Sequence, residues 1–151
     1  RVASCQGIVA SERVELQGQT LMVYQDGKTA DLASLLVQWY RIQSASILKH
    51  KLDQFAGTLG LSYKRLIIRE QKTRWASCSH RGTFSFNWRL IMAPEPVVDY
   101  VVIHEVTHLR EMNHTKRFWG LVAEHCPSWR QHKKWLNDHG VELAAILKSR
   151  R

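Results

Sequence analysis

The chain has 151 residues, of which 44% are hydrophobic and 23% charged, and its formal net charge at pH 7 is +9. This balance is typical of a globular protein and excludes an intrinsically disordered one. The three cysteines show no paired spacing, which excludes a disulfide framework and favours a reducing, cytoplasmic location. No apolar run approaches the roughly 20 residues of a membrane span, so we expect no membrane association.

The length suits one compact domain, and we expect a single domain over residues 1–151, with short strands in 1–30 and the motif-bearing core in 31–140. Arg1 stands in place of a Met, which suggests that the native start is missing. The excess of Lys and Arg favours acidic partners, including non-specific contact with nucleic acid, but the basic clusters are short. We infer no obligate protein partner.

The first part of the chain predicts a hairpin followed by a long helix. Residues 14–16 and 20–24 read as strands separated by the turn at 17–19, and Asp26-Gly27 then breaks the pattern. From Asp31 to about Leu59, apolar residues recur at i, i+3 and i+4 steps, and Gly60 stands where a helix commonly ends. We expect this helix to pack beside a sheet and to carry no chemistry.

Three strands and a set of helices follow. Residues 65–69, 75–78 and 83–88 read as strands, with a turn at 79–82 between the last two. Pro94 and Pro96 end the sheet and open an apolar helix that includes residues 97–103. Thr115 can cap a further helix. Another is expected from Trp129 to about residue 139, closed by Gly140, with one more short helix over 141–147.

The apolar helix carries the pattern His104-Glu105-Val106-Thr107-His108. On a helix of 3.6 residues per turn, His104 and His108 project within about 40° of each other, so the two imidazoles can share a metal ion. Glu105 lies next to that face and can hold the water of a catalytic ion. This pattern is typical of zinc hydrolases when a third ligand follows it.

His114 is the expected third ligand. If the helix continued, His114 would point away from His108, so the chain must turn after about Met112. Asn113 makes the turn plausible, because Asn tolerates the left-handed conformation that ends helices. The remaining candidates for the third ligand are Glu111, Glu124 and His125.

Four motifs in a fixed order are more specific than the helix pattern alone. They are Arg-Trp-Ala-Ser-Cys-Ser at 74–79, Asn-Trp-Arg-Leu at 87–90, the helix pattern followed by Leu109, and Asn113-His114-x-x-x-Phe118-Trp119. With them the chain resembles the YgjP-like metallopeptidase family, related to the SprT-like zinc proteases, over roughly residues 31–140. It departs from the usual family pattern at Ala76, where the family has Gly.

The resemblance implies an α+β, zincin-like fold in which a small mixed or antiparallel sheet packs on the long N-terminal helix and the metal-binding helix, with a C-terminal helical part. It also implies Zn²⁺ held by His104, His108 and His114, with Glu105 as the base and a protein or peptide as substrate. Some relatives have been assigned nucleoside-triphosphate pyrophosphatase activity, and SprT-like relatives act on proteins bound to DNA.

Three protein ligands leave a fourth position for water, which favours a catalytic metal site over a structural one. We expect the strand over residues 83–87 to pair with an extended peptide substrate. The candidate contacts to the substrate or transition state are Arg74, Phe84, Asn87 and Arg89, with Tyr100 as a further donor. Two alternatives remain open: hydrolysis of nucleoside triphosphates at the same metal site, and a nucleic-acid-associated protein with a structural metal.

Overall fold

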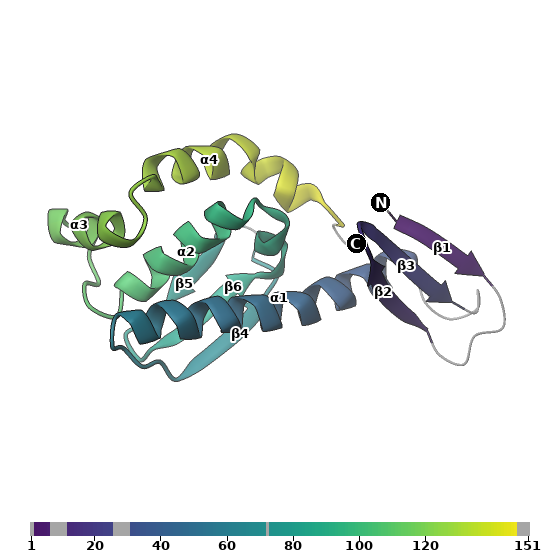
Figure 1. Ribbon diagram of the computed structural model, residues 1–151, viewed down its shortest axis with the longest axis horizontal. Helices are drawn as coiled ribbons and strands as arrows, with labels where there is room; N and C mark the ends of the chain where they lie inside the picture. The colour runs from purple at the N-terminus through teal and green to yellow at the C-terminus, as the bar shows by residue number, and fades with distance from the viewer. Residues whose placement is uncertain (1, 7–11, 26–30, 72, 148–151) are drawn as a thin grey trace. The chain divides into compact units, whose positions relative to one another are not determined.

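The computed structural model describes residues 2–6, 12–25, 31–71 and 73–147. They fall into two units: the described residues up to Ile42 together with Leu147 form one, and those from Gln43 to Ile146 form the other. The predicted break at Asp26-Gly27 lies outside the described residues. Helix α1 (Leu32–Thr58) begins in the first unit and ends in the second (Figure 1).

The first unit contains a three-stranded sheet made of β1 (Val2–Gln6), β2 (Arg13–Gln17) and β3 (Thr20–Gln25), in the order β1-β3-β2. β2 and β3 are antiparallel, which confirms the predicted hairpin, and β1 is parallel to β3. Gly18 takes a positive φ of 59° in the turn, a conformation that glycine adopts without steric cost. The small core of this unit contains Leu21, Val23 and Leu36.

Helix α1 ends as the sequence predicts. Gly60 has a φ of +63°, its N–H donates to the carbonyl of Gly57, and the N–H of Leu61 donates to the carbonyl of Ala56. This pair of bonds is the Schellman motif, which satisfies carbonyls at a helix end that would otherwise lack donors. Leu48 and Leu52 of α1 are fully buried in the core of the second unit.

The second unit contains a mixed sheet of β4 (Arg65–Arg69), β5 (Ala76–Cys78) and β6 (Thr83–Asn87), in the order β4-β6-β5. β4 runs parallel to β6, and β5 runs antiparallel to it. β6 is therefore the central strand, and both of its edges are already paired. The prediction that it would pair with an extended peptide is wrong, because a strand needs a free edge for that interaction.

Four helical elements follow the sheet: the 3₁₀ helix η1 (Trp88–Met92), α2 (Glu95–Thr107), α3 (Lys116–His125) and α4 (Trp129–Ala145). α4 is continuous, so the predicted break at Gly140 and the separate last helix are wrong. Gly140 is buried within α4, and an added Cβ would lie 3.4 Å from Nε1 of Trp75. This position has room for little more than a Cβ beside Trp75, and the glycine does not end the helix.

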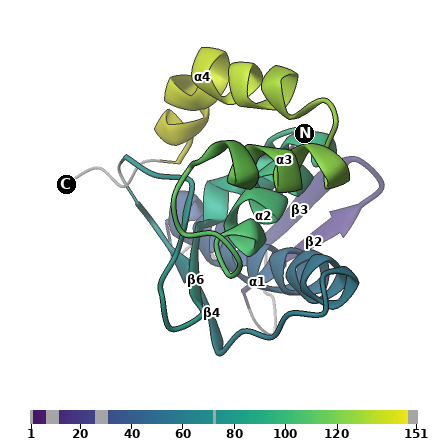
Figure 2. The same cartoon turned by 90° about the vertical axis from the view of Figure 1, so that its left-hand side faces the viewer.

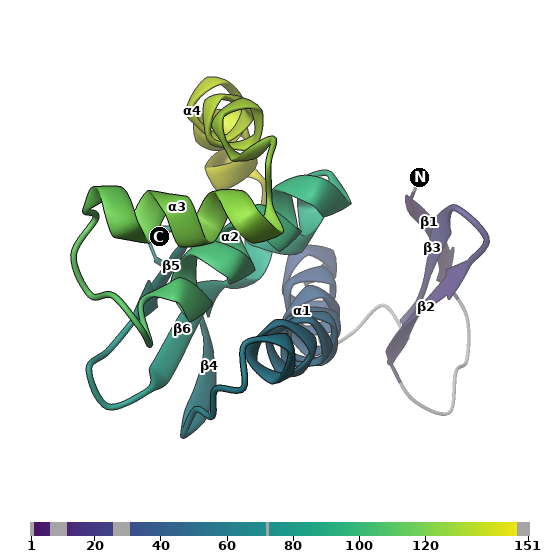
Figure 3. The ribbon, with the colours of Figure 1, turned by 60° about the vertical axis from the view of Figure 1, so that its left-hand side comes forward.

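Helix α2 lies at the centre of the second unit. Figures 2 and 3 show the sheet on one side of α2, with α3 and α4 on the other. At the start of α2, Glu95 and Asp99 form ion pairs with Lys51 of α1, with N–O distances of 2.8 and 2.6 Å. Within the described part of the chain, no helix has both the length and the apolar character needed to cross a bilayer.

Candidate metal centre

Helix α2 positions three of the predicted site residues. Nine of its 13 residues are buried, so a polar side chain on this helix lies inside the protein unless that side chain faces a cavity or the surface. Pro94 precedes the helix and Pro96 lies in its first turn, where a missing N–H has no cost. His104 and His108 are one turn apart, and their ring centroids are 5.0 Å apart. The local spacing therefore produces the expected pair of imidazoles.

The end of α2 differs from the prediction. The helix ends at Thr107 and tightens: the N–H groups of His108, Leu109 and Arg110 each donate to a carbonyl three residues earlier, as in a 3₁₀ turn. Among the described residues, Leu147 is the only non-glycine residue with a positive φ. The predicted helix end near Met112 and the left-handed role of Asn113 are therefore both wrong.

The connection from α2 to α3 nevertheless brings His114 to the other two histidines. Its ring centroid lies 5.0 Å from that of His104 and 4.8 Å from that of His108. One ligand nitrogen from each of the three rings lies within 4.8 Å of the others, and Nε2 of His104 and Nε2 of His114 are 3.0 Å apart. Thr115 fixes the start of α3 directly after His114, because its side chain accepts a hydrogen bond from the N–H of Phe118.

Phe118 packs against all three imidazoles. Its side chain is fully buried, and its ring centroid lies 4.9, 4.6 and 4.7 Å from those of His104, His108 and His114. Trp119 lies beside His104 and His114 at 5.6 and 5.8 Å. The sequence placed both aromatic residues on a helix but did not indicate this role. The motif Asn113-His114-x-x-x-Phe118-Trp119 is the part of the sequence that links these aromatic residues to His114.

The first two imidazoles are held neutral. Burial lowers the pKa of His104 to about 3, and the nearby His108, His114 and Lys133 add to the effect. Burial also lowers the pKa of His108, although its hydrogen bond to Glu111 opposes this. Nδ1 of His108 lies 3.2 Å from the carbonyl oxygen of Glu111, which can only accept a hydrogen bond. Nδ1 therefore carries the proton, and Nε2 keeps a lone pair that can bind a metal.

Glu105 lies between His104 and His108 in the sequence, and its side chain is buried. Burial raises the pKa of its carboxyl group to about 7, and the positive charge of Arg74 partly opposes this shift. Burial raises the pKa of the Cys78 thiol on β5 to about 12, and the negative charge of Glu105 adds to this shift. Glu105 therefore lies within electrostatic range of both Arg74 and β5, which places the predicted contact Arg74 near the predicted base.

Three other candidate contacts lie inside the fold. Phe84 is fully buried and its ring packs against Tyr63 at 5.5 Å. The side chain of Asn87 caps η1 through the N–H of Arg89 and donates to the carbonyl of Gln71. Arg89 is 2% exposed, donates to the carbonyl of Ile146 and forms an ion pair with Glu70 at 2.7 Å. These groups stabilise the second unit, and we retain only Arg74 for the site.

The remaining candidates for the third ligand, Glu111, Glu124 and His125, do not belong to the histidine group. In the described chain, the only group of at least three side chains that could hold a metal is His104, His108 and His114. A carboxylate oxygen of Glu111 accepts from the N–H of Asn113, and Glu124 is exposed. Tyr100, the further donor considered, is buried with its ring 6.1 Å from that of His104, and burial raises its pKa to about 12.

Comparison with known proteins places this geometry in a wider context. The structure is similar to the metallopeptidase zymogen abylysin of Pyrococcus abyssi, with a TM-score of 0.54 and 22% identity over 60% of this chain and 93% of that one. It is also similar to the metallopeptidase zymogen jannalysin of Methanocaldococcus jannaschii, with a TM-score of 0.54 and 17% identity over 60% of this chain and 94% of that one. At these identities the likeness shows the fold alone. That fold is α+β and zincin-like, as the sequence predicts.

A search of curated proteins finds no significant match. The model of the YgjP-like metallopeptidase domain, by contrast, matches residues 5–139, which is most of the chain and includes all three histidines. This match confirms the resemblance drawn from the sequence motifs, and it implies a metal cofactor and a protein or peptide substrate. The chain belongs to the YgjP-like metallopeptidase family.

Proposed function

We propose that the chain is a zinc-dependent endopeptidase in which His104, His108 and His114 hold the ion and Glu105 is the general base. One observation carries the proposal: three imidazole nitrogens converge within 4.8 Å, next to a buried carboxyl group. We further propose that it acts as a single domain, in the cytoplasm and without an obligate partner.

The three histidines suit zinc. Zinc binds neutral imidazoles at about 2.0–2.1 Å in tetrahedral sites, and burial keeps His104 neutral at pH 7. Three protein ligands leave one position open, as in catalytic sites. An ion held there would lower the pKa of a bound water from 15.7 to about 7 and would polarise the scissile carbonyl.

Glu105 supplies the proton transfers. Its carboxylate accepts a proton from the attacking water and delivers it to the leaving nitrogen, as a general base and then a general acid. Arg74 is exposed and close enough to lower the pKa of Glu105, so its guanidinium is a candidate donor to the negative charge that develops on the carbonyl oxygen.

The free edge of β5 is the proposed binding site for the scissile segment. Among the described strands, β5 pairs only with β6, and it lies against α2. An extended peptide that pairs with β5 would run past the metal helix, with backbone hydrogen bonds fixing its direction. β5 thus replaces β6 as the proposed peptide-binding strand, because both edges of β6 are already paired.

The test is the Glu105→Gln variant, with Glu111→Gln as the matched control. Both changes remove one carboxylate near the metal centre, but only Glu105 is proposed as the base. We expect Glu105→Gln to retain zinc and to lose about 10²–10⁴-fold in the rate of peptide cleavage. Glu111→Gln should retain most activity, because its carboxylate lies outside the histidine group.

Assaying unfolded proteins, DNA-bound proteins and nucleoside triphosphates side by side separates the substrate classes. Cleavage of triphosphates alone, lost in Glu105→Gln, would refute the peptidase proposal and keep the metal site. Full activity of Glu105→Gln on any cleaved substrate would show that the assigned base is wrong.

A further inference from the structure

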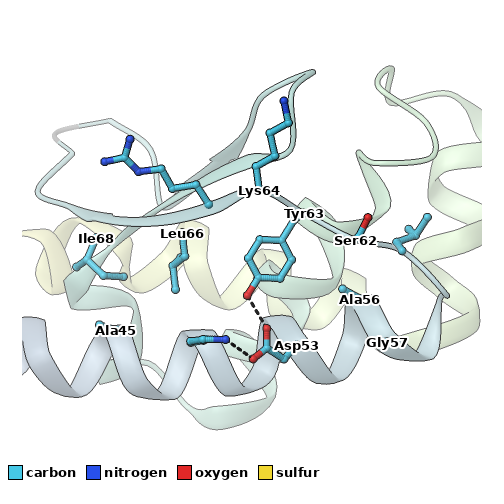
Figure 4. Close-up of a pocket in the computed structure, with 12 residues that line it drawn as sticks. Ala45, Asp53, Ala56, Gly57, Ser62, Tyr63, Lys64, Leu66 and Ile68 are labelled. Carbon is cyan, nitrogen blue, oxygen red and sulfur yellow. Dashed lines mark hydrogen bonds and ion pairs between the residues drawn. The ribbon is translucent and has the colours of Figure 1, made fainter.

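The second unit has a groove that is lined by none of the three histidines and not by Glu105. It has a volume of about 760 Å³ and runs between α1 and the segment from Leu61 to Ile68, which includes most of β4 (Figure 4). We call it the α1–β4 groove. Within the described sheet, β4 pairs only with β6, whereas the strand that lies against α2 is β5, at the opposite edge. The groove and the metal centre are thus on opposite edges of the sheet.

The groove follows the edge of β4 and not one face of the sheet. Side chains of successive residues in a strand point to opposite faces. Arg65 and Leu66 are consecutive residues of β4, and both line the groove. A free strand edge presents unpaired N–H and C=O groups, which is the template for adding another extended chain.

The charges of the groove are not balanced within it. Asp53 is its only acidic lining residue, and it is already engaged by Lys49 at 2.6 Å and by the hydroxyl of Tyr63 (Figure 4). Lys64 and Arg65 are exposed and form no ion pair with any residue that the structure describes. Two positive charges therefore remain available along the strand edge.

The floor of the groove favours a polypeptide over a nucleic acid. It is lined by apolar and small side chains, which are Ala45, Ala56, Gly57, Leu61, Leu66 and Ile68. Single-stranded nucleic acids bind through aromatic rings on which bases stack. Tyr63, the only aromatic lining residue, packs edge-on against Phe84 and donates its hydroxyl to Asp53.

We propose that the α1–β4 groove binds an extended acidic segment of another polypeptide, which adds to the free edge of β4. Alternate side chains of that segment point in opposite directions. Apolar ones pack on Leu61, Leu66 and Ile68, and acidic ones pair with Lys64 and Arg65. This site is independent of zinc and of catalysis, so it can be tested separately from the proposed function.

The binding test uses the 151-residue chain with Glu105→Gln, so that a peptide probe is not consumed. The probe is a fluorescent peptide of eight alternating Glu and Val residues, and its anisotropy reports binding. We expect saturable binding that weakens as salt rises, and no binding of the corresponding Lys-Val peptide. The Lys64→Glu/Arg65→Glu variant should lose at least about tenfold in affinity. Arg130→Glu/Lys134→Glu, with the same change in net charge on α4, should bind as before.

A second variant tests the groove by shape without changing charge. A Cβ added at Gly57 would meet no atom within 4 Å, and Gly57 has no positive φ, so Gly57→Phe fills the groove without straining α1. Phe also has a higher helix propensity than Gly, so the variant should be at least as stable as the parent. We expect it to abolish binding of the Glu-Val peptide while zinc content and cleavage of a short neutral peptide are unchanged.

The outcomes decide the proposal without reference to the metal centre. Loss of binding in Lys64→Glu/Arg65→Glu and in Gly57→Phe, with binding kept in the α4 control, supports it even if no peptidase activity is found. Absence of binding, or binding that Gly57→Phe leaves intact, overturns it. A single-stranded oligonucleotide that binds through Lys64 and Arg65 while the peptide does not, or self-association of the chain through this edge, also overturns it.

Discussion

Replacing Phe118 by Ala should destabilise the second unit and disorder the histidines together. Phe118 is 0% exposed, and its ring lies within 4.9 Å, centroid to centroid, of all three imidazoles. Burying an alanine in place of a phenylalanine in a core costs about 3–5 kcal/mol. That is a large part of the roughly 5–15 kcal/mol by which most domains are stable, and in a chain of this length it corresponds to a fall in Tm of about 6–20 °C. Phe118→Leu, which keeps most of the volume, should cost much less than Phe118→Ala.

The assay combines urea unfolding of the metal-free protein with zinc titration at a temperature where each variant is folded. Residues that orient metal ligands typically change metal affinity by about 10–100-fold when replaced, and we expect Phe118→Ala to fall in that range. Phe118→Leu should lie between the parent and Phe118→Ala in both measurements. A loss below about 1 kcal/mol in Phe118→Ala, with unchanged zinc affinity, would refute the role assigned to this ring.

Three further changes test individual contacts. Arg89→Met should lower the free energy of unfolding by about 3 kcal/mol, because it removes the ion pair to Glu70 and the donor to the Ile146 carbonyl. Zinc affinity should stay unchanged. A catalytic defect without loss of stability would contradict this structural role. Gly140→Ala should stabilise α4 by up to about 1 kcal/mol, since its Cβ would meet Trp75 at ordinary contact distance, whereas Gly140→Leu should destabilise it; denaturation of both variants checks the sign. Burial raises the pKa of Cys78 to about 12, so its thiol should stay protonated at pH 8.5. In a variant with the other two cysteines replaced by Ala, thiolate absorbance should therefore appear only well above pH 9.

The parts of the fold that depend on local spacing could be predicted from the sequence. The i, i+4 step places His104 and His108 on one face of any helix, and Gly60 ends α1 because its backbone accepts a positive φ. The positions of strands β4 and β6 and the cap at Thr115 likewise follow from neighbouring residues. Such features are decided within a few residues of the chain.

The parts that depend on contacts between distant segments could not. Gly140 looked like a helix end, but Trp75, which is 65 residues earlier in the chain, packs against it. Nothing in residues 83–87 shows that β4 and β5 pair with both edges of β6. The turn to His114 was expected for the right reason, the need to reverse direction, but the chain uses a tightened turn at His108 and not a left-handed Asn113. Buried Arg89 resembled a catalytic donor because its structural partners, Glu70 and Ile146, are not its neighbours in sequence.

The most direct test of the central claim is the X-ray absorption spectrum of zinc in the zinc-loaded chain. The proposed site predicts three imidazole nitrogens at about 2.0–2.1 Å together with one light ligand that the protein does not supply. His114→Ala should reduce the imidazole count to two, and Glu105→Gln should leave the spectrum unchanged. A carboxylate in place of the third imidazole, a shell closed by four protein ligands, or a spectrum that His114→Ala does not alter would contradict the account.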